Sequence, residues 1–287
     1  MLEIKLRKKT KTTLSKVILF GAFFIITTVI LFPLFSLILS SFRPGRDLMR
    51  FGITFASIQP TGLMFDNYPP LFFTGESNYL FWLQNSVLLV LFQTVISIFF
   101  SSLVGYGLAI YKFKGKKLLF AIVLVMMITP IQILILPLYK IMISLKIMNT
   151  YLAIILPFII SPFAVFFFRQ YSLGLPRALL DAARIDGVSE IGIYFRIMTP
   201  LLKPAFGAMA ILESLRSWNS YLWPLIVLRT SKMFTLPIGL NALITPYGNN
   251  YDLLISGSVV ATVPIIVIFI IFQKYFISGL SVGSVKG

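Results

Sequence analysis

The side chains that most enzymes use for catalysis are largely missing from this sequence. Its 287 residues contain no histidine and no cysteine. This excludes a histidine-based triad, a thiol nucleophile, a disulfide framework and a zinc site built from these residues. The sequence also lacks the Gly-x-x-x-x-Gly-Lys-Ser/Thr loop that cradles nucleotide phosphates. We therefore expect no catalytic and no metal site in this chain, and an ATP-driven process would need a second chain.

A few polar and aromatic residues lie in or near long apolar stretches. Glu213 and Arg216 interrupt the run Pro204–Leu228, and their spacing lets them pair on a helix, which lowers the cost of burying charge. Their role is structural pairing or gate support in one interpretation and substrate contact in the other. Trp218 and Trp223 could stack on the apolar face of a ligand ring, or they could pack in the membrane or form an interfacial aromatic belt. The candidate residues of a substrate path are Gln132, Glu213, Trp218, Asn219 and Trp223.

The connection Ser172–Lys203 is rich in charge and has clear helix signals. Pro176 suits the first position of a helix, and Gly187 suits a left-handed cap that ends it. Ser189 can cap a second short helix, which Pro200 is expected to end. The connection therefore reads as a helix, a glycine turn and a second helix on one face of the membrane.

One side of the first helix in this hairpin combines small and apolar residues. Helical spacing places Leu179, Ala182, Ala183 and Asp186 on that side. The two alanines would make a flat patch that a partner could approach closely, while Asp181 and Arg184 can pair along the helix. The hairpin is either a docking element or a solvated structure with no partner.

The composition indicates that the candidate residues belong to a membrane protein, in which transmembrane helices and their connections position them. Hydrophobic residues make up 58% of the chain and charged residues 12%, against about 45–50% and about 25% in soluble domains. This excludes a soluble globular domain and intrinsic disorder. Apolar runs of about 20 residues predict transmembrane helices, because barrel strands would alternate polar and apolar positions. The six predicted spans lie in Val17–Phe42, Ser77–Tyr111, Leu118–Tyr139, Ile147–Phe168, Pro204–Leu228 and Leu253–Gln273.

Several features of the spans carry further expectations. The first span is too long for a signal peptide and lacks a small-residue cleavage site, so we interpret it as a retained anchor. A small residue recurs every fourth position from Ser97 to Ala109, which favours close helix packing within the chain over a dimer interface. The uncharged stretch Met233–Tyr251 is rich in Pro, Gly and Asn, so we expect an external loop, with a re-entrant segment as the alternative.

The basic residues predict the orientation. The net charge is +16, and Lys and Arg concentrate in the N-terminal tail, after the second span and after the fourth span. Because such residues gather in cytoplasmic loops, both termini are expected to be cytoplasmic. Topology thus explains the charge without nucleic-acid binding.

These features predict an all-α membrane protein with six transmembrane helices. The expected parts are a basic cytoplasmic tail (1–16), a first transmembrane helix (17–42), an external segment (43–81), a core with five transmembrane helices (82–277) that includes the cytoplasmic loop 172–203, and a Gly-rich cytoplasmic tail (278–287).

The hairpin resembles a known motif. Asp181-Ala182-Ala183, three residues, Gly187, nine residues and Ile197-Met198-Thr199-Pro200 are similar in spacing to the EAA loop of ABC importer permeases, with Asp181 in place of Glu and Thr199 in place of Leu. The form Ala-Ala-Arg-Ile-Asp-Gly, Trp218-Asn219, Trp223-Pro224 and the C-terminal sequence resemble the carbohydrate branch. The terminal motif resembles the smaller permease of maltose-type importers.

The resemblance implies a type I importer permease fold and a function in sugar import. It also implies four kinds of partner besides the lipid membrane: a second homologous permease, two ATPase subunits that bind the ATP and Mg²⁺, an extracellular solute-binding protein, and the sugar it delivers. The implied ATPase-coupling residues are Asp181, Ala182, Ala183, Gly187, Ile197 and Pro200. The implied contacts of the C-terminal tail are Gly279, Gly283, Lys286 and Gly287.

Three other functions stay open. An ABC permease for a polyol, glycerol phosphate or another solute would share the coupling hairpin. An ion-coupled secondary transporter would need intramembrane carboxylates, and Glu213 is the one candidate. A membrane enzyme would need a catalytic constellation that the residue types do not offer.

Overall fold

The described part of the chain is helical. A computed structural model describes residues 2–45, 63–73, 77–245 and 248–281. Its strands are one short antiparallel pair, β1 (Ile244–Thr245) and β2 (Gly248–Asn249). Three helices are long and apolar enough to cross a membrane, and the number rises to six if each of three bent pairs counts as one span. The predicted all-α membrane fold is confirmed.

The chain divides into two compact units, residues 1–75 with 243–259 and residues 76–242 with 260–287. The first unit contains α1 (Leu2–Ser41), α4 (Pro69–Phe72), the strand pair and the start of α16 (Tyr251–Ser281). Because α1 begins at Leu2, most of the basic tail predicted for residues 1–16 continues the helix of the first span.

In the first unit, the segment that follows α1 is fixed by side-chain contacts. The Asn67 amide donates hydrogen bonds to the carbonyl oxygens of Ser41 and Arg43, both at 2.8 Å. The Ser256 hydroxyl donates to the Asn67 carbonyl at 3.1 Å, which ties the segment to the first turns of α16. Hydrogen bonds therefore hold the described part of the predicted external segment in a defined conformation.

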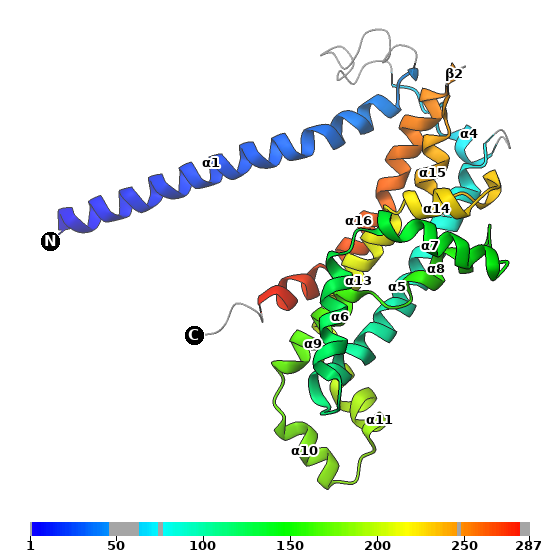
Figure 1. Ribbon diagram of the computed structural model, residues 1–287. Coiled ribbons are helices and arrows are strands. Elements are labelled where there is room, and N and C mark those ends of the chain that lie inside the picture. The colour runs from blue at the N-terminus through cyan, green and yellow to red at the C-terminus, as the bar shows by residue number, and fades with distance from the viewer. Residues whose placement is uncertain (1, 46–62, 74–76, 246–247, 282–287) are drawn as a thin grey trace. The chain divides into compact units, whose positions relative to one another are not determined.

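The second unit is organised around α5 (Tyr79–Ile110), which packs against α9 (Pro162–Leu173) and α13 (Lys203–Trp218) (Figure 1). The stripe of small residues faces α9. A Cβ atom at Gly105 would lie 2.8 Å from the Cβ of Phe168, and the Ser101 hydroxyl accepts a hydrogen bond from the Ser161 amide at 2.9 Å. The prediction that this stripe packs within the chain is confirmed.

The third predicted span is not one straight helix. α6 (Lys116–Ile128) and α7 (Ile131–Ser144) meet at an angle of 104°. Thr129 is extended because it precedes Pro130, and the proline is the N-cap of the next helix. The uncharged run Leu118–Tyr139 predicted one span, because hydropathy does not show where a helix changes direction.

The fourth and fifth predicted spans are also interrupted. In the fourth, α8 (Tyr151–Ile155) and η1 (Leu156–Phe158) are bent by 42° from α9. In the fifth, α13 ends at Trp218 rather than continuing to Leu228, and a separate short helix follows, α14 (Leu222–Val227).

The stretch predicted as an external loop contains a buried helix. After η3 (Ser231–Met233), α15 (Leu236–Asn241) packs against α5. Gly239 lies directly under the Trp82 ring, because an added Cβ would come 2.0 Å from its Cδ2 atom. The Asn85 amide donates hydrogen bonds to two backbone carbonyls before α15, at 2.8 and 2.9 Å. A polar side chain of α5 thus supplies hydrogen bonds to the backbone carbonyl groups of a segment that the sequence predicts to be an external loop.

Candidate functional site

The connection between α9 and α13 forms the predicted hairpin beyond one end of the second unit's helices (Figure 1). Gly187 follows α10 (Ala178–Ile185) and has a φ of +74°, the left-handed conformation that the pattern predicts. Ser189 caps α11 (Glu190–Gly192), since its hydroxyl accepts a hydrogen bond from the Gly192 amide at 3.2 Å. The helix, glycine turn and second helix are confirmed.

The two prolines of the hairpin do not lie where predicted. Pro176 precedes α10 by two residues, and Arg177 is the N-cap. Pro200 does not end the second helix, because α11 continues through η2 (Ile193–Met198, a π-helix) into α12 (Thr199–Leu201). Pro200 lies just after the π-helix, in the first turn of α12.

The exposed face of α10 differs from the predicted one. Ala183 is only 5% exposed, because it packs with Leu180 against Tyr106 of α5 and Tyr194 of η2. A flat patch of two alanines is therefore wrong: neighbouring helical residues point about 100° apart, and Ala182 alone faces solvent. Besides the buried Leu180 and Ala183, the residues of α10 are exposed, and Ile185 is 86% exposed. Leu179, Ala182, Ile185 and the C-cap Asp186 lie on the exposed face used below.

An ionic brace holds the hairpin together. The Arg184 guanidinium donates to Asp181 Oδ1 at 3.2 Å, the predicted pair, and to Glu190 Oε1 at 2.8 Å across the glycine turn. The Tyr111 hydroxyl, at the end of α5, donates to Glu190 Oε2 at 2.7 Å. The hydrogen bond with Glu190 is the main cause that raises the pKa of Arg184. These contacts join both limbs of the hairpin to the long central helix.

The remaining coupling candidates lie on or beyond this hairpin. Ile197 is half-buried against the cluster around Ala183, and Pro200 is exposed. Of the tail candidates, Gly279 lies within the helical range of α16. Gly283, Lys286 and Gly287 lie outside the described residues.

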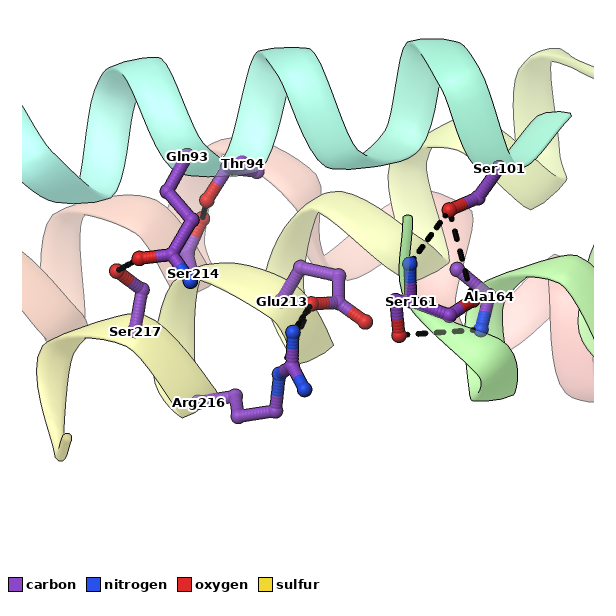
Figure 2. A network of polar contacts seen from close by, with 9 residues as sticks. All are labelled: Gln93, Thr94, Ser101, Ser161, Ala164, Glu213, Ser214, Arg216 and Ser217. Carbon is purple, nitrogen blue, oxygen red and sulfur yellow. Dashed lines mark hydrogen bonds and ion pairs between the residues drawn. The ribbon is translucent and has the colours of Figure 1, made fainter. Parts of the chain in front are cut away.

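Glu213 and Arg216 form the predicted ion pair on α13, at 2.9 Å (Figure 2). Glu213 is 4% exposed, while Arg216 is partly exposed and its guanidinium carbon lies 5.7 Å from the Phe158 ring centre. Because a buried carboxylate is costly unless paired, this geometry fits structural pairing or gate support.

Further polar contacts join α5 to α13 along the same region (Figure 2). Ser217 donates a hydrogen bond to Gln93 at 2.9 Å, and the hydroxyls of Thr94 and Ser214 lie 3.2 Å apart. Such bonds between membrane helices are individually worth about 0.6 kcal/mol, so they set register more than stability.

The structure does not bring the substrate-path candidates into one site. Trp223 is buried, and its indole N–H donates to the Ala153 carbonyl at 3.0 Å, so it packs within the chain. Asn219 is exposed at the end of α13, with its amide bonded to the Leu215 carbonyl at 2.9 Å. Gln132 is exposed at the start of α7.

Trp218 differs from these residues because it lines a groove. The groove has a volume of about 650 Å³ and lies between α5, α13 and the second unit's part of α16. Its walls are mostly apolar, with Thr94 and Ser214 among the lining residues and Lys203 as a basic one. It can hold apolar side chains of another helix or line part of a path.

Sequence reasoning did not assign the structural roles of two polar residues that hold the fold together. Tyr111 bonds to Glu190, and the side chain of Asn85 links α5 to α8 and to the backbone before α15. An Asn within a strongly apolar helix indicates that its side chain forms hydrogen bonds with other parts of the chain, because an unpaired polar group is costly in a membrane. The partner of Tyr111 could not be found from the sequence because it depends on how the hairpin folds back.

Comparisons with known proteins agree with this geometry. Residues 97–282 match the family described as binding-protein-dependent transport system inner membrane component. Over 282 residues the chain is 56% identical to the arabinooligosaccharides transport system permease protein AraQ of Bacillus subtilis (strain 168), covering 98% of this chain and all of that protein. The lactose transport system permease protein LacG of Rhizobium radiobacter is 32% identical, over 89% of this chain and 91% of its own length.

A solved structure shares the fold. The crystal structure of a bacterial ABC transporter involved in the import of the acidic polysaccharide alginate includes a chain that matches with a TM-score of 0.78. The match covers 94% of this chain and 98% of that one at 20% identity. The resemblance inferred from the hairpin is therefore confirmed: the chain belongs to the family of binding-protein-dependent transport system inner membrane components.

Proposed function

We propose that this chain is the permease subunit of an ABC importer for arabino-oligosaccharides. The observation that carries the sugar class is the 56% identity to a protein named for arabinooligosaccharide transport, across nearly the whole of both chains. The scarcity of charge in the spans suits a neutral, hydroxyl-rich substrate. Glu213, the carboxylate on α13, is already paired with Arg216 and so offers no free counter-charge.

The exposed face of α10 is the proposed docking site for a cytoplasmic ATPase. Ile185 and Leu179 are apolar side chains held at the surface of a rigid helix, and Ala182 between them leaves room for close approach. Asp181 and Asp186 add negative charge at its edges. ATP and Mg²⁺ would be held by that partner, because this chain has no phosphate-binding loop.

The brace supplies the proposed mechanical link. When the ATPases close around ATP, the docked hairpins move, and a rigid hairpin passes that motion on. Glu190 and Arg184 fix its two limbs, and Tyr111 fixes it to α5. Because α5 packs on α9 and α13, the movement reaches the spans that would open alternately to the two sides.

The other partners follow from the same proposal. A second homologous permease would complete the path, and the apolar groove beside Trp218 is a surface against which its helices could pack. A solute-binding protein would deliver the sugar to the end of the second unit opposite the hairpin, where α14 and α15 lie. The C-terminal tail from Gly279 onward would contact the ATPases.

The experiment that tests this function is uptake of labelled arabinotriose by cells that express the chain with its partner subunits and lack other arabinoside importers. We expect ATP-dependent uptake that unlabelled arabino-oligosaccharides compete away and that lactose and glycerol 3-phosphate do not. Competition by glycerol 3-phosphate alone would move the chain to that substrate class. Uptake that follows an ion gradient without ATP would contradict an ABC importer.

Gly187 provides a matched pair of controls for the coupling step. Its left-handed backbone is closed to Pro, whose φ is fixed near −65°, and is accessible to Asn. No atom of the described residues lies within 4 Å of an added Cβ, so the effect is expected to come from the backbone. Uptake should be lost in Gly187→Pro and kept in Gly187→Asn, with both proteins present in the membrane.

A further inference from the structure

The turn between α5 and α6 is a rigid structure that exposes several lysines. The Lys116 ammonium donates hydrogen bonds to the carbonyl oxygens of Ala109, at 3.1 Å, and Tyr111, at 2.9 Å, which closes the end of α5. Gly115 has a φ of +87°, so the chain reverses there without strain. The neighbouring Lys112 and Lys117 side chains are exposed.

A groove of about 500 Å³ runs over this turn. Its lining residues are Lys112, Phe113, Gly115, Lys116, Lys117 and Leu118. Three of them carry an ammonium group and none carries a carboxylate. The groove therefore combines a basic wall with two exposed apolar side chains, Phe113 and Leu118.

Further cations lie close to this basic wall. Arg169, Arg177 and Lys112 all lie close enough to repel the Lys116 ammonium. The carboxylates of the adjoining hairpin, Asp181 and Glu190, are both bonded to Arg184. An anion in the groove would relieve the repulsion among these cations.

The position of the turn identifies the source of that anion. The turn joins two apolar helices, so it lies where hydrocarbon ends and water begins. The Leu118 side chain is 66% exposed and lies within one helical turn of Lys116 and Lys117. In a membrane it would therefore lie beside the acyl chain of a lipid whose headgroup contacts these lysines. A soluble anion would gain nothing from these apolar neighbours, whereas a phospholipid would use both.

We propose that the groove formed by Lys112, Lys116 and Lys117 binds the phosphate headgroup of an anionic phospholipid, with its acyl chains along Phe113 and Leu118. The lysine ammonium groups donate hydrogen bonds to the phosphate oxygens, as basic pockets at the cytoplasmic ends of membrane helices do. The site requires only that α5 and α6 lie in the membrane, and it does not depend on the transported solute.

The test is native mass spectrometry of the purified full-length chain, with the subunits that accompany it, titrated with phosphatidylglycerol. The variant Lys112→Gln with Lys117→Gln removes two exposed lysines and leaves Lys116 to hold the turn. The matched control, Lys140→Gln with Lys146→Gln, removes two exposed lysines at the end of α7. A third variant, Lys112→Arg with Lys117→Arg, keeps the charge.

We expect the Gln variant of the groove to bind phosphatidylglycerol about 25-fold more weakly, since each of the two lysines contributes about fivefold at a membrane surface. The α7 control and the Arg variant should bind like the unaltered chain, and phosphatidylcholine should not distinguish the proteins. Equal binding by all variants would overturn the site. Saturable binding of inorganic phosphate that blocks the lipid would assign the groove to a soluble anion instead.

Discussion

Arg184 is the residue on which the geometry of the hairpin depends. It contacts a carboxylate on its own helix, Asp181, and another beyond the glycine turn, Glu190. Exposed ion pairs contribute little to stability. Their value here is geometric, because Glu190 also accepts the hydrogen bond from Tyr111 and so connects α10, α11 and α5.

Glu190→Gln is expected to weaken coupling without unfolding the protein. The amide keeps the shape and can still accept the Tyr111 bond, but it loses the ion pair with Arg184. We expect the amount of sugar imported per ATP hydrolysed to fall about two- to fivefold, as exposed pairs are modest, with unchanged thermal stability. The measurement is uptake and ATP hydrolysis by the reconstituted importer.

Arg196→Gln is the control for that change, because Arg196 is an exposed cation of the same hairpin that forms no ion pair among the described residues. Its ratio of import to hydrolysis should match the unaltered protein. A Glu190→Gln protein with an unchanged ratio would show that the brace is only structural.

The sequence could predict part of this arrangement at the residue scale. Asp181 and Arg184 are three residues apart on one helix, so local geometry fixes their pairing. The hydrogen bond that Tyr111 donates to Glu190 joins residues 79 positions apart, and no local rule brings them together. The burial of Ala183 was missed for the same reason, since it depends on Tyr106 and Tyr194 packing against α10.

At the scale of helices, α5 and α9 pack closely in the second unit. Gly105 allows the approach, because an added Cβ would lie 2.8 Å from both the Phe168 Cβ and the Val165 carbonyl oxygen. Gly107, two residues later in α5, has open space instead: an added Cβ would meet only Tyr111 Cδ2, at 4.0 Å.

Substituting Ala at these two glycines should have opposite effects. Alanine favours a helix over glycine by about 1 kcal/mol, so Gly107→Ala should leave the melting temperature unchanged or raise it. Gly105→Ala has to push two backbones apart, and overpacking costs about 1–3 kcal/mol, so its melting temperature should fall. Differential scanning fluorimetry in detergent measures both. A Gly105→Ala protein as stable as Gly107→Ala would refute the packing argument.

Helix existence was predictable at this scale and helix direction was not. The apolar runs located the spans because each needs enough length to cross the bilayer. The 104° break at Thr129 and Pro130 was not assigned, since a proline in a membrane helix can produce a slight bend or a new helix depending on its neighbours. The buried helix α15 was missed because the groups that satisfy its surroundings, such as Asn85, lie in another span.

At the scale of the whole molecule, the second unit has two distinct ends that agree with the charge pattern. At one end, Tyr111 after α5 bonds to Glu190 of the hairpin, which joins two connections predicted to be cytoplasmic. At the other, the Asn149 side chain accepts hydrogen bonds from the backbone amides of Arg229 and Thr230, which joins two connections predicted to be external. An inner membrane permease with six spans would place these ends on opposite sides.

The absence of cysteine allows this orientation to be tested directly. A single Cys can be introduced in place of Lys114 or Asp186 at the hairpin end, or in place of Lys146 at the other end, all of which are exposed. We expect a membrane-impermeant maleimide to label Lys146→Cys in intact cells, and Lys114→Cys and Asp186→Cys only after the membrane is opened. The reason is that the dense Lys and Arg connections stay in the cytoplasm during insertion. Labelling of the hairpin position in intact cells would invert the topology and, with it, remove α10 from reach of a cytoplasmic ATPase.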